Sequence, residues 1–462
     1  MGFDSQWPKM WGQQSSLFVV QRVVCKTIFI DAQIQLMKSF VKEDEASWRQ
    51  FIRRTFFAPV AEFHRRYDTV IVCFDNYQNV PVFKSIEQSK RTAASSAAQS
   101  RDFQFKAGDE LPSKPYEQKI WVQALQNRSF KSNIISLITS MMAAEYTPPR
   151  VATTLVIDFV NSTRIYYLTH SKTRTVLQHL KPMGESDVKF MRYVPLFGDM
   201  CVDSIDSDVL LIAALFVSRN SYKGNIYVRR YKTRLPAPPS AASANTTPAE
   251  TAVCKRKTPE AVHTKPEKRR LEYEIIHVNL LLGVLHTTMQ NAAAMSSQSD
   301  EIQQVSPAHL TAMLSFMVLL CGCDYSKKLP RIGVKSLWDN MDVVVPAMLQ
   351  CTSYTDNVFA VDTEVSINGL IASLYARIYT KHVASASTNL DAVLARLHAS
   401  TLSDKTKNDL PTHDSLNTTL RNIEWVINYW SIENSDPICP IDGTHGFLLV
   451  NNKIVAGGPP AE

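Results

Sequence analysis

The sequence lacks the patterns that mark several common classes of protein. Its eight cysteines are scattered with no CxxC pair, so neither a zinc ribbon nor a disulfide framework is indicated. The longest apolar runs, such as 313–320, are far too short to span a bilayer. The first residues show no basic segment followed by an apolar stretch, the mark of a secretory signal. We therefore expect an intracellular protein with no membrane partner.

The composition is that of a folded protein with a mild excess of positive charge. A chain of 462 residues with 45% hydrophobic and 20% charged residues is long enough for one large or two medium domains. The net charge of +7 fits a polyanionic partner without proving one. From residue 235 to about 264 the chain is rich in Pro, Ala, Ser and Thr, which cannot bury enough surface to fold. This stretch is expected to be a linker.

Two uninterrupted apolar strands, at 27–31 and 68–75, each end in an acid, Asp31 and Asp75. The segment 32–66 between them has helical periodicity. Apolar strands that alternate with helices predict an α/β fold, with a central mainly parallel sheet covered by helices on both faces. In such sheets, function gathers at the carboxyl ends of the strands. Further strands are expected at 154–160, 164–168, 173–177, 199–203 and 225–229, helices over 306–345, and a helical tail beyond 355 that ends in short strands.

More acids follow at the expected starts of helices. Glu185 and Asp187 open one helix, and Asp206 and Asp208 precede another. Asp324 follows the apolar run 313–320. Two-metal phosphodiester hydrolysis needs several carboxylates around divalent cations about 4 Å apart. Oxygen ligands without a His/Cys cluster favour Mg²⁺ or Mn²⁺ over zinc. The plain alternative is that such acids are solvated helix caps.

These acids lie within short motifs that occur in a particular order. The motifs are Ile-Phe-Ile-Asp31-Ala, Val-Cys-Phe-Asp75, Gly184-Glu185-Ser186-Asp187, Asp206-Ser-Asp208, Gly322-Cys323-Asp324-Tyr325 and Ile332-Gly333-Val334-Lys335. The offset from Glu185 to Asp206 and from Asp187 to Asp208 is 21 residues in both cases. In order and offset the set resembles the flap endonucleases of the xeroderma-pigmentosum-G-type 5′-nuclease superfamily.

The resemblance implies a fold and a set of roles. The fold would be a PIN-like nuclease core with a helical arch and a helix-two-turn-helix module. The seven acids would hold two Mg²⁺ ions, with Mn²⁺ as a substitute. Lys84 and Arg91, which resemble the basic residues at the base of the helical gateway, would be catalytic. Contacts to DNA would come from Gly2, Arg331, Ile332, Gly333, Val334 and Lys335.

The sequence departs from the family pattern at several positions. Asn76 stands where the family usually has Gly, and Asp187 is one methylene shorter than the usual Glu. Arg331 and Val334 replace Gly and Pro at the hairpin. Two other acids, Asp158 and Asp203, also follow apolar strands and compete as ligands, although neither keeps the paired offset. No sliding-clamp motif is evident.

The expected organisation has four parts. Residues 1–234 form the N-terminal part of the nuclease core, with an arch region at 84–148 and a strand-rich insertion at 151–179. A flexible basic linker spans 235–270, the C-terminal part of the core with the helix-hairpin module spans 271–345, and a helical extension spans 346–462. Two basic clusters in the linker resemble a bipartite nuclear-localisation signal, formed by Lys255, Arg256, Lys257, Lys268, Arg269 and Arg270. A nuclear protein is therefore expected, and otherwise a cytoplasmic one.

The favoured function is a metal-dependent, structure-specific 5′-nuclease that cleaves branched, flapped or nicked DNA in replication, recombination or repair. Two other interpretations stay open. One is a 5′-nuclease that acts on RNA in messenger decay, because the same superfamily architecture serves that role. The other is a catalytically degenerate scaffold that only binds nucleic acid, against which the intact acids weigh.

Overall fold

The computed structural model describes the chain in segments. They are residues 14–42, 44–45, 47–75, 121–122, 124–125, 127–158, 165–171, 174–177, 185–204, 206, 208–231, 273–294, 302–322, 329–330, 332–380, 389–400, 403–404, 407, 410–431, 447–450 and 453–456.

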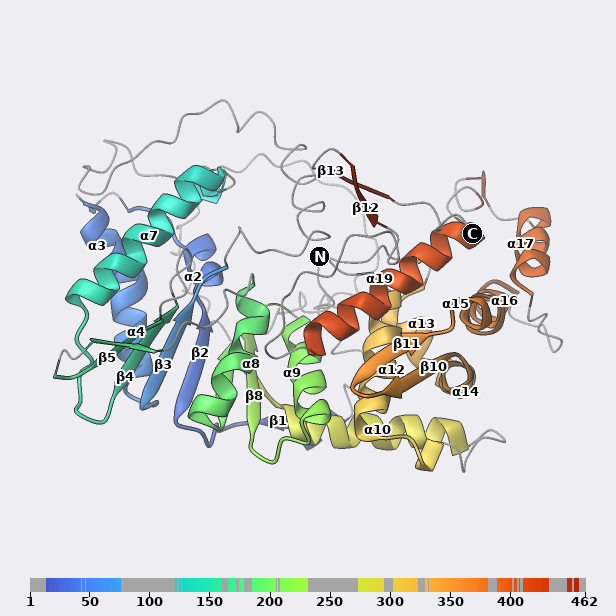
Figure 1. Ribbon diagram of the computed structural model, residues 1–462, viewed down its shortest axis with the longest axis horizontal. Helices are drawn as coiled ribbons and strands as arrows, with labels where there is room; N and C mark the ends of the chain where they lie inside the picture. Colours follow the sequence, from blue (N-terminus) through green and yellow to red (C-terminus); the bar gives the residue numbers. More distant parts are fainter. Residues whose placement is uncertain are drawn as a thin grey trace, which may run out of the picture.

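A nine-stranded sheet in the order β1-β9-β8-β7-β2-β3-β4-β5-β6 forms the centre of the fold. Its middle strands are parallel: β8 (Ile226–Tyr231), β7 (Met200–Asp203), β2 (Thr27–Asp31), β3 (Thr69–Cys73) and β4 (Thr154–Asp158). Antiparallel strands complete both edges, β9 (Tyr273–His277) and β1 (Val19–Val20) on one side and β5 (Ile165–Thr169) and β6 (Arg174–Leu177) on the other. Helices flank the sheet (Figure 1), so the predicted α/β fold with a mostly parallel central sheet is confirmed.

The order in which the chain adds strands to the sheet reverses beside β2. The chain places β3 and then β4 on one side of β2, and then returns to place β7 and β8 on its other side. Thr27 of β2 is level with Thr69 of β3 and with Met200 of β7, so these three strands start at one height. Their carboxyl ends therefore meet at a topological switch point, where open α/β sheets usually bind their ligands.

One face of the sheet is covered by α2 (Ala32–Lys38), α3 (Trp48–Ile52), α4 (Ala58–Phe63) and α7 (Arg128–Glu145), with the π-helical turn η3 (Arg53–Phe57) between α3 and α4. Aromatic rings dominate this layer. Trp48, Phe51, Trp121 and Phe130 contact one another with centroids 5.2 to 6.4 Å apart. The Trp121 indole N–H donates to the Leu36 carbonyl at 2.8 Å, which satisfies its buried polar atom.

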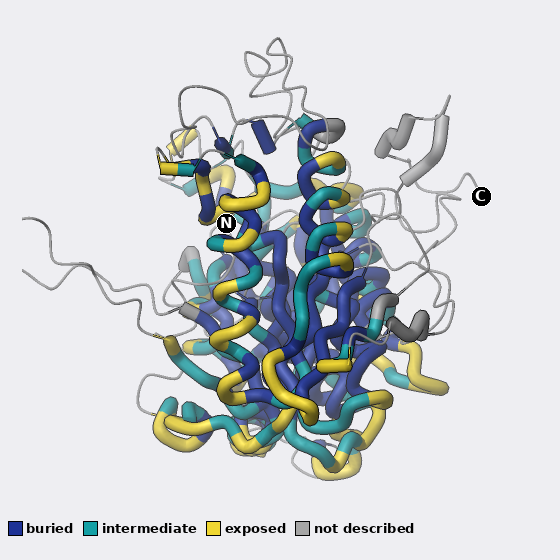
Figure 2. The backbone as a smooth tube through the Cα atoms, turned by 90° about the vertical axis from the view of Figure 1, so that its left-hand side faces the viewer, coloured by how far each residue is buried: buried dark blue, intermediate teal, exposed yellow. Residues whose placement is uncertain are grey.

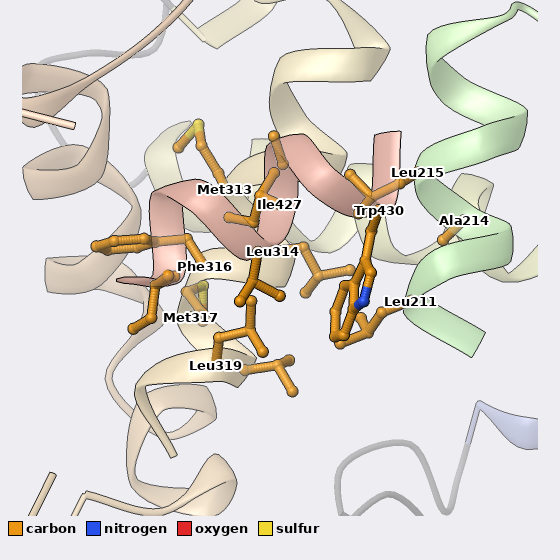
Figure 3. Packing of buried hydrophobic residues seen from close by; sticks show 14 of the residues in the cluster. Leu211, Ala214, Leu215, Met313, Leu314, Phe316, Met317, Leu319, Ile427 and Trp430 are labelled. Atoms are coloured by element: carbon orange, nitrogen blue, oxygen red, sulfur yellow. The ribbon is translucent and has the colours of Figure 1, made fainter. Parts of the chain in front are cut away.

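The other face carries the larger core, built on α8 (Ser186–Phe197), α9 (Asp208–Arg219), α10 (Val278–Ala294), α12 (Pro307–Leu320) and α19 (His413–Ser431). Every residue of α12 from Leu310 to Leu320 is buried, as expected for a helix that is apolar on all sides. Figure 3 shows Trp430 of α19 packed close to α9 and α12. Trp425, Tyr429 and Trp430 of α19 are all buried in this core.

The prediction of a helical tail beyond residue 355 is wrong for the first residues of that tail. After α13 (Val334–Trp338) and α14 (Met341–Cys351), the chain forms a hairpin of β10 (Thr352–Thr355) and β11 (Val358–Val361). Its two-residue turn, Asp356 and Asn357, has φ of 51° and 63°. Two positive φ values suit the twist of a tight hairpin, and Asp and Asn tolerate them. The helical part follows as α15 (Thr363–Val365), the π-helical turn η6 (Ser366–Ile371), α16 (Ala372–Thr380) and α17 (Leu390–Ala399), with strands β12 (Phe447–Val450) and β13 (Lys453–Ala456) after α19.

Figure 2 shows the buried residues gathered in the middle of the molecule, with exposed residues along outer helices and loops.

The expected insertion at 151–179 contains β4, which pairs in parallel with β3, and then β5 and β6 at the sheet edge. The expected linker 235–270 lies outside the described residues, as does most of the arch region before α7. No helix in the described segments is long and apolar enough to cross a membrane.

The buried ring of His64 predicts a pH dependence of stability. His64 is fully buried at the end of α4 and stacks on Tyr146, with centroids 6.0 Å apart. Burial lowers the pKa of His64 from 6.5 to about 4, so the ring is neutral in the folded protein. Protonation then favours the unfolded state. Stability from this group is complete above pH 6.5 and is lost as the pH falls towards 4, by at most about 3 kcal/mol.

We therefore expect the His64→Phe variant to lose less free energy of unfolding than the parent protein between pH 6.5 and pH 4. Urea denaturation at several pH values measures the difference. His398→Phe is the matched control, because His398 is exposed on α17. A His64→Phe variant whose pH dependence equals that of the parent would contradict the assignment.

Candidate functional site

Asp31 is held at the end of the central strand. It is the last residue of β2 and the N-cap of α2, where its Oδ1 accepts the N–H of Gln33 at 3.0 Å. Only 7% of Asp31 is exposed. The strand-to-helix junction thus fixes this carboxylate at the switch point of the sheet, as the sequence predicted.

The N-terminus of α8 docks on the end of β3. Asp75 lies two residues beyond β3, and its Oδ1 accepts the backbone N–H of Ser186 at 3.0 Å and the Ser186 hydroxyl at 2.9 Å. Ser186 is the first residue of α8 and stands between Glu185 and Asp187. Glu185 is 1% exposed. One helical turn therefore brings two acids to Asp75, and Ser186 is a site residue that sequence reasoning missed.

Asp206 and Asp208 follow β7, the other neighbour of β2. The Asp206 N–H donates to the Ser204 hydroxyl oxygen at 3.1 Å, and the Asp208 N–H donates to Asp206 Oδ1 at 3.1 Å. Asp208 is the first residue of α9 and is buried. This chain of side-chain-to-backbone hydrogen bonds orders the turn that leads from the strand into the helix.

The pKa of Asp31 reflects both its burial and the acids around it. It is raised to about 7, first by burial, then by the negative charge of Asp75, and in a smaller measure by that of Asp206. Hydrogen bonds from Ser186 and from the Gln33 amide oppose the rise. Asp31, Asp75 and Asp206 therefore share one electrostatic environment, although they come from three strands far apart in the sequence.

Burial excludes a solvated position for three of these acids, although Asp31 does cap α2. Asp31, Glu185 and Asp208 are all buried, and a buried carboxylate is costly unless it is compensated. Clustered carboxylate oxygens are the donor set that Mg²⁺ prefers, so the chemistry of the site fits that ion. Among the residues that the structure describes, no group of three or more such side chains is already arranged to hold a metal ion.

The competing acids Asp158 and Asp203 have partners of their own. Asp158 is buried at the end of β4, where its Oδ2 accepts the Tyr193 hydroxyl at 3.0 Å and lies 3.5 Å from Lys189 Nζ. Asp203 Oδ1 lies 3.1 Å from Arg229 Nε. Each is neutralised by a cation, which favours an ion-pair role for both and leaves the expected acids as the better ligand candidates.

Several expected site residues lie outside the described segments. They are Gly2, Lys84, Arg91, Asp324, Arg331, Lys255, Arg256, Lys257, Lys268, Arg269 and Arg270.

Part of the expected DNA-binding turn can be placed. Ile332 and Val334 are buried, and the Ile332 N–H donates to the Leu329 carbonyl at 3.2 Å, so that amide already has a partner within the protein. Gly333 caps α13 in an extended conformation. The Lys335 side chain is 71% exposed and pairs with Asp339 one turn further on. Within this turn, the described residue that presents charge to solvent is Lys335.

A cleft of about 1090 Å³ opens beside Asp31. Asp31 and Ser204 lie among its lining residues, together with Lys38 from the last turn of α2 and Arg229 from β8. Burial of the Lys38 ammonium lowers its pKa to about 8, and the charges of Asp203 and Asp31 oppose this shift. Lys38 thus lies near both acids, and no sequence motif pointed to it.

No protein-family model matches the chain, and no curated protein is significantly similar to it. The likeness of the motifs to those of the flap endonucleases therefore depends on the residues themselves.

The buried pair of Lys189 and Asp158 gives a test of stability. Lys189 is 2% exposed, and its Nζ also donates to the Phe74 carbonyl at 2.7 Å, next to Asp75. Removing one partner of a buried pair leaves the other charge uncompensated, which costs about 3–5 kcal/mol. We expect Lys189→Met to lower the free energy of unfolding by roughly that amount in urea denaturation.

The double variant Lys189→Met with Asp158→Asn should recover part of this loss, because it removes both charges and keeps an acceptor for Tyr193. A double variant that is less stable than Lys189→Met alone would show that the ion pair is not the reason for the loss.

Proposed function

We propose that the protein is a metal-dependent 5′-nuclease with a PIN-like core, which cleaves phosphodiester bonds in branched or nicked DNA. The observation that carries the proposal is that Asp31, Asp75 and Asp206 lie at or just beyond the carboxyl ends of three adjacent parallel strands, where burial, and then the charges of Asp75 and Asp206, raise the pKa of Asp31. The order and spacing of the motifs support it independently.

The seven acids would hold two Mg²⁺ ions, for which Mn²⁺ would substitute. They are Asp31, Asp75, Glu185, Asp187, Asp206, Asp208 and Asp324. Bound there, the ions would activate a water molecule and stabilise the leaving oxygen.

The chain's own residues would prepare this centre. Ser186 orients Asp75 through two hydrogen bonds, and the Gln33 amide orients Asp31. Both carboxylates are held before any ligand binds, which reduces the cost of assembling the centre. Lys84 and Arg91 are proposed to stabilise charge on the scissile phosphate, and Gly2 and the turn 331–335 to contact duplex DNA.

Asp208 provides the sharpest test of the chemistry. We expect Asp208→Ala to lower the single-turnover rate of cleavage in Mg²⁺ by several orders of magnitude and to leave substrate binding largely intact, because the variant removes a metal ligand and leaves the phosphate contacts in place. Asp68→Ala is the matched control. Asp68 lies at the opposite, amino end of β3, in partly exposed ion pairs with Lys26 and Arg150.

The substrates for this test are end-labelled flap, nicked and single-stranded DNA and matched RNA, each with Mg²⁺ or EDTA. Cleavage of the DNA flap that disappears in EDTA supports the proposal. Preferential cleavage of RNA favours the messenger-decay alternative. Near-parental cleavage by Asp208→Ala would refute the assignment of the site.

A further inference from the structure

We infer that the cleft beside Asp31 binds unpaired nucleotides and leads a single strand to that carboxylate. This inference rests on the proposed nuclease function and adds the conformation of the nucleic acid that the site receives. It is carried by the position of the cleft, by the charges along it and by the aromatic rings that it presents.

The cleft lies on the face of the sheet that carries α2 and α4. Lining residues come from α2, η3 and α4 on one side, and from β8, β9 and the segment after β1 on the other. Asp31 and Ser204 line the end of the cleft that lies at the carboxyl ends of β2 and β7, at the switch point of the sheet. A strand held in the cleft would therefore reach Asp31, the proposed metal ligand that lines it.

Arg229 lies over aromatic rings from both walls of the cleft. The Arg229 guanidinium lies 5.1 Å from the ring centroid of Phe63 on α4 and 3.9 Å from that of Tyr273 on β9. Asp203 holds the same guanidinium through its ion pair. Tyr273 nevertheless keeps 42% of its surface exposed, and Phe40, another lining residue, keeps 37%. The cleft thus offers aromatic surface that is fixed in place and open to a ligand.

Positive charge predominates along the cleft. Six basic residues and three acidic residues line it, and the acids include Asp31 at the carboxylate centre. Arg22, Arg65 and Arg66 are exposed, and Arg65 pairs with Glu62. A basic groove interleaved with aromatic rings is the pattern by which proteins hold single strands, with cations on the phosphates and rings on the bases.

The same features argue against a duplex in this position. In a duplex the faces of the bases are stacked on one another, so Tyr273 and Phe40 could not reach them. A cleft of about 1090 Å³ between a helical layer and a sheet has the size of a large ligand pocket. It admits a few unpaired nucleotides, whereas a duplex has to bind elsewhere, on an open surface.

Charge reversal tests the phosphate contacts. Binding of labelled oligo-dT, oligo-rU and a blunt DNA hairpin is followed by fluorescence anisotropy in EDTA, so that no cleavage occurs. We expect Arg22→Glu with Arg66→Glu to weaken single-strand binding at least about tenfold, and to reduce the salt slope by roughly 1.4 for two lost contacts. Binding of the blunt hairpin should remain as in the parent protein.

A matched pair controls for net charge. Lys223→Glu with Arg396→Glu makes the same change in charge at two exposed residues that do not line the cleft. It should leave single-strand binding nearly unchanged. An equal loss in both double variants, or an equal loss of hairpin and single-strand binding, would overturn the inference.

Tyr273 tests the stacking. Tyr273→Ala should weaken binding of oligo-dT by about 5- to 100-fold, and Tyr273→Phe should bind like the parent protein. Binding of a base-free strand of the same length should not respond to either change. If Tyr273→Ala weakens the base-free strand as much as oligo-dT, no base stacks on this ring and the inference fails.

The outcomes separate this inference from the proposed function. Cleft variants that bind single strands normally, in a protein that cleaves in Mg²⁺, would refute the cleft and leave the nuclease. Loss of single-strand binding in the cleft variants of a protein that cleaves nothing would support the cleft and refute the nuclease. Tighter binding of oligo-dT would identify DNA as the source of the strand. Tighter binding of oligo-rU would identify RNA.

Discussion

The level pairing of β2 with β3 and β7 is the constraint on which the site depends. Because Thr27 stands opposite both Thr69 and Met200, the three strands end together, and the acids that follow them share one small region. A slip of two residues in either pairing would keep every side chain on its own face but would move one acid by about 7 Å along the strand. The apolar core on both faces therefore fixes the chemistry at the edge as well as the fold.

The buried acids at the strand ends are of two kinds. Asp158 and Asp203 have cationic partners in Lys189 and Arg229, which stabilise the fold around them. Asp31 instead has carboxylates as neighbours, and its pKa is raised first by burial and then by the negative charges of Asp75 and Asp206. A fold that compensates two of its buried acids and leaves a third among like charges keeps an electrostatic preference for a cation at one place.

The sequence predicted what local patterns determine. Uninterrupted apolar runs located β2 and β3, and the acids after them marked the carboxyl edge correctly. The two-residue strand β1 is too short to give a periodic signal, and β9 is only five residues long, with partly exposed and exposed positions that give no buried apolar run. The hairpin at Asp356 and Asn357 was missed, although Asp and Asn tolerate the positive φ values that its two-residue turn requires. Ser186, Lys38 and the cleft depend on helices docking on strands distant in sequence, and no local pattern contains that information.

The all-round burial of α12 has a consequence for how the protein is made. The helix has no face suited to water, and α19, which covers it together with α9, begins 93 residues after α12 ends. A ribosome therefore releases α9 and α12 before their cover exists. During that interval their apolar surface is open to chaperones and to neighbouring nascent chains. The order of synthesis thus makes the larger core the part of the molecule most exposed to misassembly, whereas the aromatic layer around Trp48 and Trp121 is complete much earlier.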